Sequence, residues 1–273
     1  MISALSGALS DALETSVAVF DLDSVCGGSS NSAAVARTCE GDFFVTGNDS
    51  AVVDMFDREA EGLDALRTSG TSLRIPQPVT WRQAGKEHPA FLVMNYFEAG
   101  PPVANYEERL GQGLAELHRA TTNQFGFTND NYCGLSTQPN PWTDDWLTFY
   151  REHRLRHQLH LAGKDRGIPA TQFRMFERVL DHLDVLLDID DEPPALIHGD
   201  LWAGNKHTTH EGLPALVDPA AYYGHREAEL GMMKLFGGFG PTVWDAYDEA
   251  YPLQPGWRQR LPLYELYHVL NHY

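Results

Sequence analysis

The sequence predicts an α+β protein of two lobes, a small N-terminal lobe of sheet plus one helix and a larger, mainly helical C-terminal lobe. At 273 residues the chain is longer than most single domains, which favours two units. Strand-like apolar runs occur in its first hundred residues, whereas later apolar residues recur at helical spacing. The stretch 95–100 is expected to be the hinge, so the lobes are placed at 1–97 and 98–273.

The N-terminal elements follow from short patterns. Residues 42–46, Asp-Phe-Phe-Val-Thr, lie between two glycines and are predicted to be a strand, as is the apolar run 91–94. The stretch 51–68 is predicted to be a helix that stops before Gly70, because its apolar residues recur at helical spacing: Val52, Phe56, Ala60, Leu63 and Leu66.

Helical spacing dominates the second half. Leu110, Leu114 and Leu117 share one face of a predicted helix that ends near Arg119. Another helix is predicted to begin around Trp146, with Thr143 as its N-cap. The stretch 173–187 carries a further apolar stripe, which is more typical of a core helix than of a cofactor site.

Composition limits the location of the protein. No apolar run approaches the roughly 18–20 residues of a membrane span, and no basic region precedes an apolar stretch at the N-terminus, so neither a membrane nor a secretory signal is expected. Cys26, Cys39 and Cys133 form no Cys-x-x-Cys pair, which favours a reduced, cytoplasmic setting. A structural zinc site is not expected, because His and Cys do not occur together in ligand spacing.

The net charge of −18 argues against nucleic acid as a partner, because such binding depends on basic side chains that neutralise phosphates. The acidic surface is instead expected to be solvated and repulsive. Any phosphorylated ligand would therefore depend on a local cation, a metal ion or backbone N–H groups.

Three polar side chains carry the strongest functional signal. Asp200 follows the apolar run 195–197, Asn205 comes five residues later, and Asp218 ends a second run, 213–217. Transfer of a nucleotide γ-phosphoryl group needs a carboxylate to accept the acceptor's proton and oxygen ligands for Mg²⁺. Each Asp alone is most often a turn residue, but their joint spacing favours a site in which two strands and a tight loop bring the three together.

These residues lie in segments that resemble the fructosamine-kinase (ketosamine-3-kinase) family, small-molecule kinases with a protein-kinase-like fold related to aminoglycoside and choline phosphotransferases. The main matches are HGDLWAGN at 198–205 and VDPAAYYGHREAELGMMKLFGGF at 217–239. Further similar stretches bring the resemblance to roughly residues 20–272: 27–31, 55–63, 125–127, 137–140, 142–146 and 266–272.

The resemblance implies a role for each matched residue. Asp200 would be the catalytic base, and Asn205 and Asp218 the Mg²⁺ ligands. Trp202 and His198 are expected near the acceptor, although a core aromatic packing under the loop is an equally good interpretation of Trp202. The implied ATP contacts in the N-terminal lobe are a phosphate loop, a helix glutamate and a backbone stretch beside the adenine, namely Gly27, Gly28, Ser29, Glu59, Asn95, Tyr96 and Phe97.

Two departures bear on activity. Thr46 stands where the family carries a strand lysine that joins the nucleotide phosphates to the helix glutamate, here Glu59. Loss of such a charge-assisted contact removes on the order of 1.5–3 kcal/mol. Lys206, where the family has an apolar residue, is either a solvated turn residue or a replacement for the missing charge. The chain also ends soon after His272, and a shortened final helix would leave apolar surface for a partner.

The expected function is therefore that of an ATP- and Mg²⁺-dependent kinase. Its implied acceptor is a hydroxyl of a ketosamine of the fructosamine or ribulosamine type, free or on a protein lysine, and its implied role is repair of glycation. Two alternatives stay open: a pseudokinase-like binding protein, and a related phosphotransferase for an aminoglycoside, choline or homoserine. The retained Asp200, Asn205 and Asp218 favour an enzyme, because unpaired buried carboxylates cost stability. The sequence decides neither the acceptor nor the oligomeric state.

Overall fold

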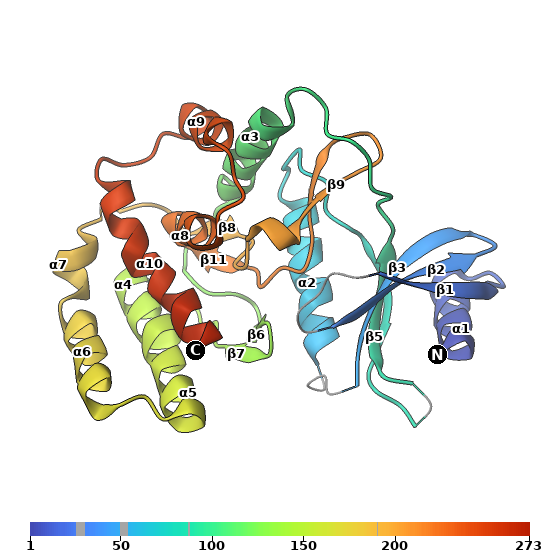
Figure 1. The fold of residues 1–273 in the computed structure, drawn as a ribbon, viewed down its shortest axis with the longest axis horizontal. Helices are drawn as coiled ribbons and strands as arrows, with labels where there is room; N and C mark the ends of the chain where they lie inside the picture. Colours follow the sequence, from blue (N-terminus) through green and yellow to red (C-terminus); the bar gives the residue numbers. More distant parts are fainter. Residues whose placement is uncertain (26–30, 50–53, 87, 190) are drawn as a thin grey trace.

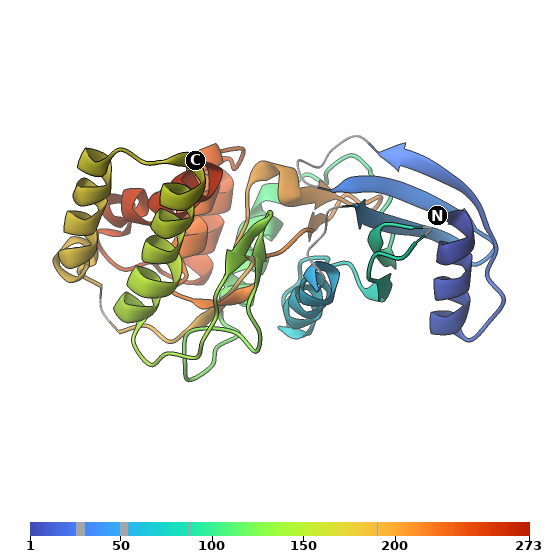
Figure 2. The same cartoon turned by 90° about the horizontal axis from the view of Figure 1, so that it is seen from below.

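A computed structural model describes residues 1–25, 31–49, 54–86, 88–189 and 191–273. It has a sheet-containing N-terminal part and a mainly helical C-terminal part (Figures 1 and 2). The elements of the N-terminal part are α1 (Ile2–Leu13), β1 (Val19–Val25), β2 (Ser32–Thr38), β3 (Gly41–Asn48), α2 (Met55–Thr68), β4 (Pro78–Arg82) and β5 (Ala90–Asn95). The α+β class and the two-part arrangement agree with prediction, whereas the boundary at 97/98 stays a prediction.

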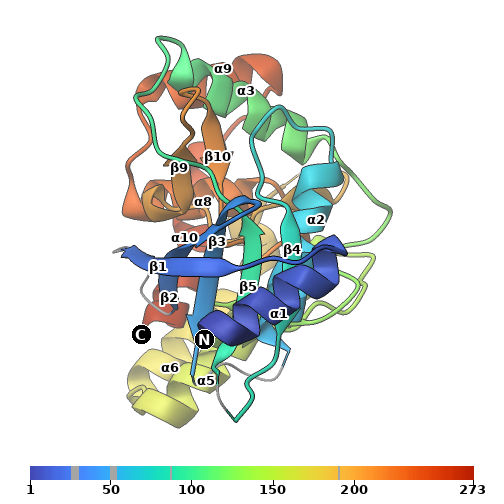
Figure 3. The same ribbon diagram turned by 90° about the vertical axis from the view of Figure 1, so that its right-hand side faces the viewer.

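The N-terminal sheet is antiparallel, with strand order β1-β2-β3-β5-β4. Its strand β5 is buried on both faces: Phe91 and Val93 pack with α1, and Leu92 and Met94 pack with α2. Figures 1 and 3 show α1 on the outer face of the sheet, and α2 lies between the sheet and the C-terminal part. The sheet therefore fixes α2 at the boundary between the two parts.

The predicted N-terminal elements are confirmed with shifted ends. The strand predicted at 42–46 is β3, the strand predicted at 91–94 is β5, and the predicted helix at 51–68 is α2, which begins at Met55. The expectation of a single helix in this part is wrong, because α1 is a second one. Leu5, Ala8 and Leu9 of α1 have helical spacing and are buried against the sheet.

The C-terminal part is a helical layer with several short strand pairs. Here α3 packs against α9, and α8 packs against α10. Its elements are α3 (Tyr106–His118), β6 (Asn131–Cys133), β7 (Ser136–Gln138), α4 (Trp146–Phe149), the π-helical turn η1 (Tyr150–Arg156), α5 (His157–Arg166), α6 (Ala170–Asp181), α7 (Leu183–Leu187), β8 (Ala195–Ile197), the 3-10 turn η2 (Ala203–Asn205), β9 (Lys206–Thr208), β10 (Pro214–Leu216), β11 (Tyr222–Gly224), α8 (Glu227–Phe236), α9 (Pro241–Ala250) and α10 (Trp257–His272). No helix in the described ranges is both long enough and apolar enough to cross a membrane.

Two expectations for this part need correction. Thr143 does not cap the helix at Trp146, because Asp145 is the N-cap and its side chain accepts a hydrogen bond from the Thr148 N–H. Thr143 instead pairs with the backbone of Phe125. The stripe at 173–187 is divided between α6 and α7, and only Leu180 of α6 and Leu183 and Leu187 of α7 are deeply buried.

Candidate active site

Two loops at the boundary between the parts carry the predicted site residues. The loop 198–205 connects β8 to β9, and the loop 217–221 connects β10 to β11. Because β8 pairs with β11 and β9 with β10, the two loops run side by side. Two backbone hydrogen bonds join them, from Ala220 N to His198 O at 2.9 Å and from Val217 N to Asn205 O at 3.0 Å.

Backbone geometry at two positions allows this close approach. Gly199 has φ +82°, and a Cβ at this position would lie 2.1 Å from Ala220 O, so only glycine fits. Asp218 adopts the left-handed conformation with φ +59°, which is uncommon for a residue with a side chain. Such strain, on the order of 1–3 kcal/mol, is typical of functional sites.

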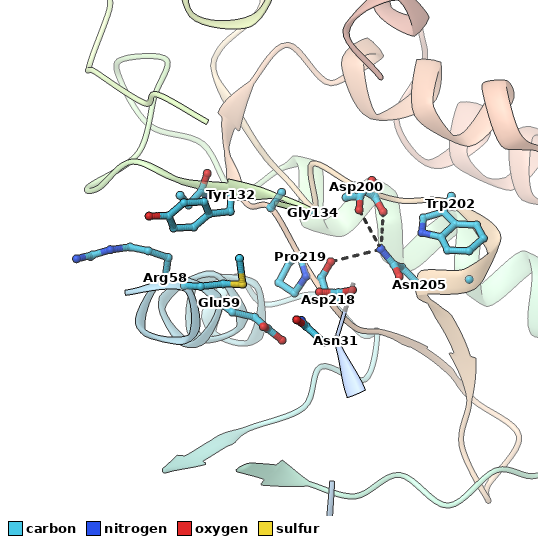
Figure 4. Close-up of a pocket in the computed structure, with 14 residues that line it drawn as sticks. Asn31, Arg58, Glu59, Tyr132, Gly134, Asp200, Trp202, Asn205, Asp218 and Pro219 are labelled. Atoms are coloured by element: carbon cyan, nitrogen blue, oxygen red, sulfur yellow. Dashed lines mark hydrogen bonds between the residues drawn. The ribbon is translucent and has the colours of Figure 1, made fainter. Parts of the chain in front are cut away.

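The loops bring together the three side chains singled out in the sequence. Asn205 Nδ2 donates to the backbone oxygen of Asp200 at 2.9 Å and lies 3.4 Å from both Asp200 Oδ2 and Asp218 O (Figure 4). Because its nitrogen is directed at these oxygens, the amide oxygen is the atom that Asn205 can offer to a cation.

These side chains face a cavity of about 280 Å³. Glu59 of α2 and Trp202 of the first loop also line it. The remaining lining residues are Asn31, Met55, Arg58, Asn131, Tyr132, Gly134, Gly204, Pro219 and Ala220. The cavity thus takes side chains from both parts of the molecule.

Three carboxyl groups lie at this cavity. Burial and the nearby carboxylates of Asp218 and Glu229 raise the pKa of Asp200 to about 8. Burial also raises the pKa of Asp218, and burial together with Asp218 raises that of Glu59 well above its ordinary value. Arg58, the basic residue in the described lining, is already paired with Asp54 and Glu61. Binding of a cation here would relieve the repulsion and favour the ionised carboxylates.

Thr46 faces the same region. It lies opposite Leu92 of β5, and directly opposed residues of an antiparallel pair project from the same face. Leu92 packs in the core with Phe56 and Ala60 of α2, so Thr46 points to the face of the sheet that α2 covers. Its hydroxyl is buried and has no hydrogen-bond partner in the described part of the chain.

Lys206 does not replace the missing lysine. Its Nζ donates to Gly238 O at 2.8 Å and lies 5.0 Å from the centre of the Phe239 ring. It does not line the cavity, so the structure contradicts the hypothesis that it turns toward the phosphates. The lysine is partly buried, and burial lowers its pKa.

The residues expected beside the adenine lie outside the cavity lining. Asn95 ends β5, and its side-chain oxygen accepts a hydrogen bond from Gln77 N, whereas Phe97 O lies 2.8 Å from His207 Nε2. A role for Asn95, Tyr96 and Phe97 beside adenine therefore stays a prediction. Gly27, Gly28 and Ser29 fall outside the described residues.

Of the two residues expected near the acceptor, Trp202 lines the cavity and His198 does not. His198 is fully buried, its Nε2 lies 2.9 Å from Val217 O, and burial lowers its pKa. It does not line the cavity, and its ring joins the two loops, so a contact with the acceptor stays a prediction that its burial does not favour. Trp202 lines the cavity, is 37% exposed and meets Phe236 edge-on, which fits a contact surface better than a core position.

Glu229 of α8 belongs to this site, although no role for it was expected from the sequence. The backbone N–H groups of His198 and Gly199 both donate to its Oε2, directly before Asp200. Although burial opposes ionisation, His118, His198 and the backbone N–H of His198 hold the pKa of Glu229 below its ordinary value. Its position within the family-like segment 217–239 was the one sequence feature that could have indicated a role. Nothing in the spacing indicated that it would bind the loop 198–205.

Together, the fold and site define a small-molecule kinase of the protein-kinase-like class. Solved structures agree on the fold: an aminoglycoside phosphotransferase in complex with ADP and hygromycin B has a TM-score of 0.64 and 15% identity, over 93% of this chain and 85% of that one. That similarity concerns the fold alone.

The chain belongs to the fructosamine kinase family, whose sequence model matches residues 1–273. A chloroplastic protein-ribulosamine 3-kinase from Arabidopsis thaliana is 40% identical over 257 residues, 92% of this chain and 76% of the relative. A "Probable ketoamine kinase" from Synechocystis is 40% identical over 254 residues, 92% and 83% of the two chains. The structure of a "putative fructosamine-3-kinase" from Thermobifida fusca has a TM-score of 0.86 and 33% identity, and the match covers 100% of this chain and 91% of that one.

Proposed function

We propose that this protein is an ATP- and Mg²⁺-dependent kinase that phosphorylates a hydroxyl of a ketosamine. The observation that carries the proposal is the convergence of Asp200, Asn205 and Asp218 on one cavity, where the pKa of each carboxyl group is raised. This arrangement has the oxygen ligands that Mg²⁺ prefers and lacks a basic side chain free to neutralise them among the described lining residues.

The residues divide the work as phosphoryl transfer requires. Asp218 and the amide oxygen of Asn205 would hold Mg²⁺, which, when bound with ATP, neutralises charge on the transferring phosphoryl group. Asp200 would orient the acceptor hydroxyl and accept its proton. Its hydrogen bond to Asn205 keeps the base at a fixed distance from the metal ligands. The cation also favours the ionised form of Asp200, which is the form that can act as a base.

The acceptor class is inferred from the relatives named as ribulosamine and ketoamine kinases. Trp202 offers a partly exposed aromatic face beside Asp200, on which the apolar face of a sugar-derived group can stack. The substrate would be a free ketosamine or one on a protein lysine, and its phosphorylation would serve repair of glycation. A cytoplasmic location stays part of the proposal.

The second candidate is a binding protein without transfer activity, and Thr46 favours it because the phosphate-binding lysine is absent. Against it stand Glu59, Asp200 and Asp218, three carboxylates held at a buried site although burial raises the pKa of each. A protein freed from catalysis has no physical reason to keep them there.

The test is a transfer assay with ATP, Mg²⁺ and a panel of acceptors: fructosamine-lysine, ribulosamine-lysine, a glycated protein, an aminoglycoside and choline. Phosphorylated ketosamine, detected by mass spectrometry in the wild type and absent with Asp200→Asn, supports the proposal. Nucleotide binding without transfer would favour the binding protein. Transfer to the aminoglycoside or choline alone would move the chain to a different acceptor class.

A further inference from the structure

Asp200 also belongs to a cluster of three side chains that could hold a metal ion, with a sulfur, a nitrogen and an oxygen as ligand atoms. The Cys133 Sγ, one carboxylate oxygen of Asp200 and one ring nitrogen of His268 all lie within 4.8 Å of one another. They come from three distant places in the sequence: the end of β6, the loop after β8 and the last helix, α10. Because the three are so far apart along the chain, sequence spacing could not indicate a metal site here.

His268 contributes one ring nitrogen to this cluster, and its ring packs edge-on against Tyr267. It is only 4% exposed, and its Nδ1 has no hydrogen-bond partner within the described ranges. Leaving a buried ring nitrogen unpaired costs about 1–3 kcal/mol. Burial lowers the pKa of His268 to about 3, so the ring is neutral at pH 7, the form that ligates metals.

Polar groups surround the sulfur of Cys133. Asn271 Nδ2 donates to Cys133 Sγ at 3.4 Å. Burial and the carboxylates of Asp200 and Asp218 raise the pKa of the thiol well above its ordinary value, against the opposing effects of the Tyr267 hydroxyl and the Arg154 guanidinium. The thiol is therefore protonated until a metal ion displaces its proton. Hydrogen bonds and charges of this kind surround metal-bound thiolates and fix their orientation.

We propose that Cys133, Asp200 and His268 form an inhibitory Zn²⁺ site. A thiolate, an imidazole and a carboxylate suit zinc, whereas Mg²⁺ prefers oxygen ligands alone. With bonds of about 2.0–2.3 Å the ligand atoms of a tetrahedral site lie roughly 3.3–3.8 Å apart, so small side-chain shifts close the cluster. Binding would release the thiol proton and, because the pKa of Asp200 is about 8, the carboxyl proton as well, and it would leave the fourth position to water.

The ion can enter through the cavity, because Asp200 is part of its lining and is partly exposed, whereas Cys133 and His268 are buried and do not line it. With its carboxylate bound to zinc, Asp200 can no longer accept a proton from an acceptor. This inhibitory consequence rests on the proposed function, whereas the metal site itself does not.

The first test measures metal binding without any kinase assay. In the Cys26→Ser/Cys39→Ser protein, Cys133 is the sole cysteine, so a thiolate-to-cobalt charge-transfer band on Co²⁺ titration belongs to it. We expect this band at one ion per chain and its loss when Zn²⁺ is added. Absence of the band in this folded protein would overturn the proposal.

Variants then identify the other ligands. His268→Gln should remove the band or shift it and weaken Zn²⁺ binding at least 10-fold, and Asp200→Asn should weaken it similarly. His272→Gln, one turn along the same helix, is the matched control and should bind Zn²⁺ as tightly as its parent. Circular dichroism confirms that each variant is folded. Equal Zn²⁺ affinity in His268→Gln and His272→Gln would refute the site.

The inhibitory role is tested in the transfer assay at saturating MgATP. Micromolar Zn²⁺ should inhibit the wild type, a zinc-selective chelator should restore activity, and the ratio of activities with and without Zn²⁺ should rise at least 10-fold in Cys133→Ser. Equal inhibition in both proteins would disprove this role. If no protein transfers phosphate, the proposed function fails, and the cobalt titration still decides whether the metal site exists.

Discussion

Replacement of Thr46 by lysine should strengthen MgATP binding. Thr46 stands on β3 at the position where the sequence resemblance predicts the family's phosphate-binding lysine, and it faces α2, which carries Glu59. Its buried hydroxyl makes no hydrogen bond to a described residue, so removal of that group costs little. The new ammonium would meet a carboxylate that has no cationic partner among the described residues at the cavity.

The size of the effect follows from the bonds that the new ammonium can form. A charge-assisted hydrogen bond to the phosphates contributes about 1.5–3 kcal/mol, which corresponds to roughly 10- to 150-fold in affinity. A lysine beside Glu59 also offsets the burial and the repulsion from Asp218 that raise the pKa of this carboxyl group. We therefore expect tighter nucleotide binding and a higher kcat/KM.

Calorimetric titration with MgATP measures the change in affinity, and Thr46→Met is the matched control because it adds length without charge. The increase in affinity should appear in Thr46→Lys and not in Thr46→Met, and Glu59→Gln should reduce it, since the lysine then loses the carboxylate that orients it. Unchanged or weaker MgATP binding in folded Thr46→Lys would refute the assignment of this position.

Further predictions concern the loops and the metal ligands. Asp200→Asn should lower kcat by roughly 10²–10⁴ while MgATP still binds, as steady-state kinetics and calorimetry would show. Glu229→Ala leaves two buried N–H groups unpaired and should cost about 2–6 kcal/mol in urea unfolding. Because the pKa of Glu229 is lower in the folded protein than its ordinary value of 4.5, the ionised carboxylate stabilises the fold fully above pH 4.5. This stabilisation is lost as the pH falls through the folded pKa, so the free energy of unfolding of Glu229→Gln should depend less on pH at the acid side. At about 100 times its Kd, Mg²⁺ should add about 2.7 kcal/mol of stability, visible as a higher Tm than in EDTA, and Asp218→Asn should abolish this shift.

Much of the fold was predictable from local patterns. β5 could be recognised as a strand because its run 91–94 is apolar throughout, and the structure shows why: alternate residues pack against α1 and α2. α1 was missed because its first turns are rich in Ser, Ala and Gly. Leu5 and Leu9 have helical spacing, but the sheet that buries them is formed by residues later in the chain. The cap at Asp145 was missed because Thr143, two residues earlier, is also of a residue type that caps helices.

The site was predictable where the chemistry lies within one segment. The spacing of Asp200, Asn205 and Asp218 indicated a shared pocket, and the structure brings them together. The sequence could not show which of the polar residues near the site are buried, or which groups they bind. His198 stands two residues before Asp200 but points into the core, and Glu229 approaches from α8, 31 residues after the His198 N–H from which it accepts a hydrogen bond.

Charge connects these observations. The sequence resemblance implies a fixed lysine that balances the helix glutamate in related kinases. Here Glu59, Asp200 and Asp218 face one cavity, and Arg58 is already paired elsewhere. The pKa of each of the three carboxyl groups is raised, so each resists ionisation until a cation arrives. On the proposed function, charge compensation would therefore come from bound ligands instead of a lysine. Such a site would depend more strongly on its metal ion than one with a built-in ammonium, and it would be open to capture by a competing ion at Asp200.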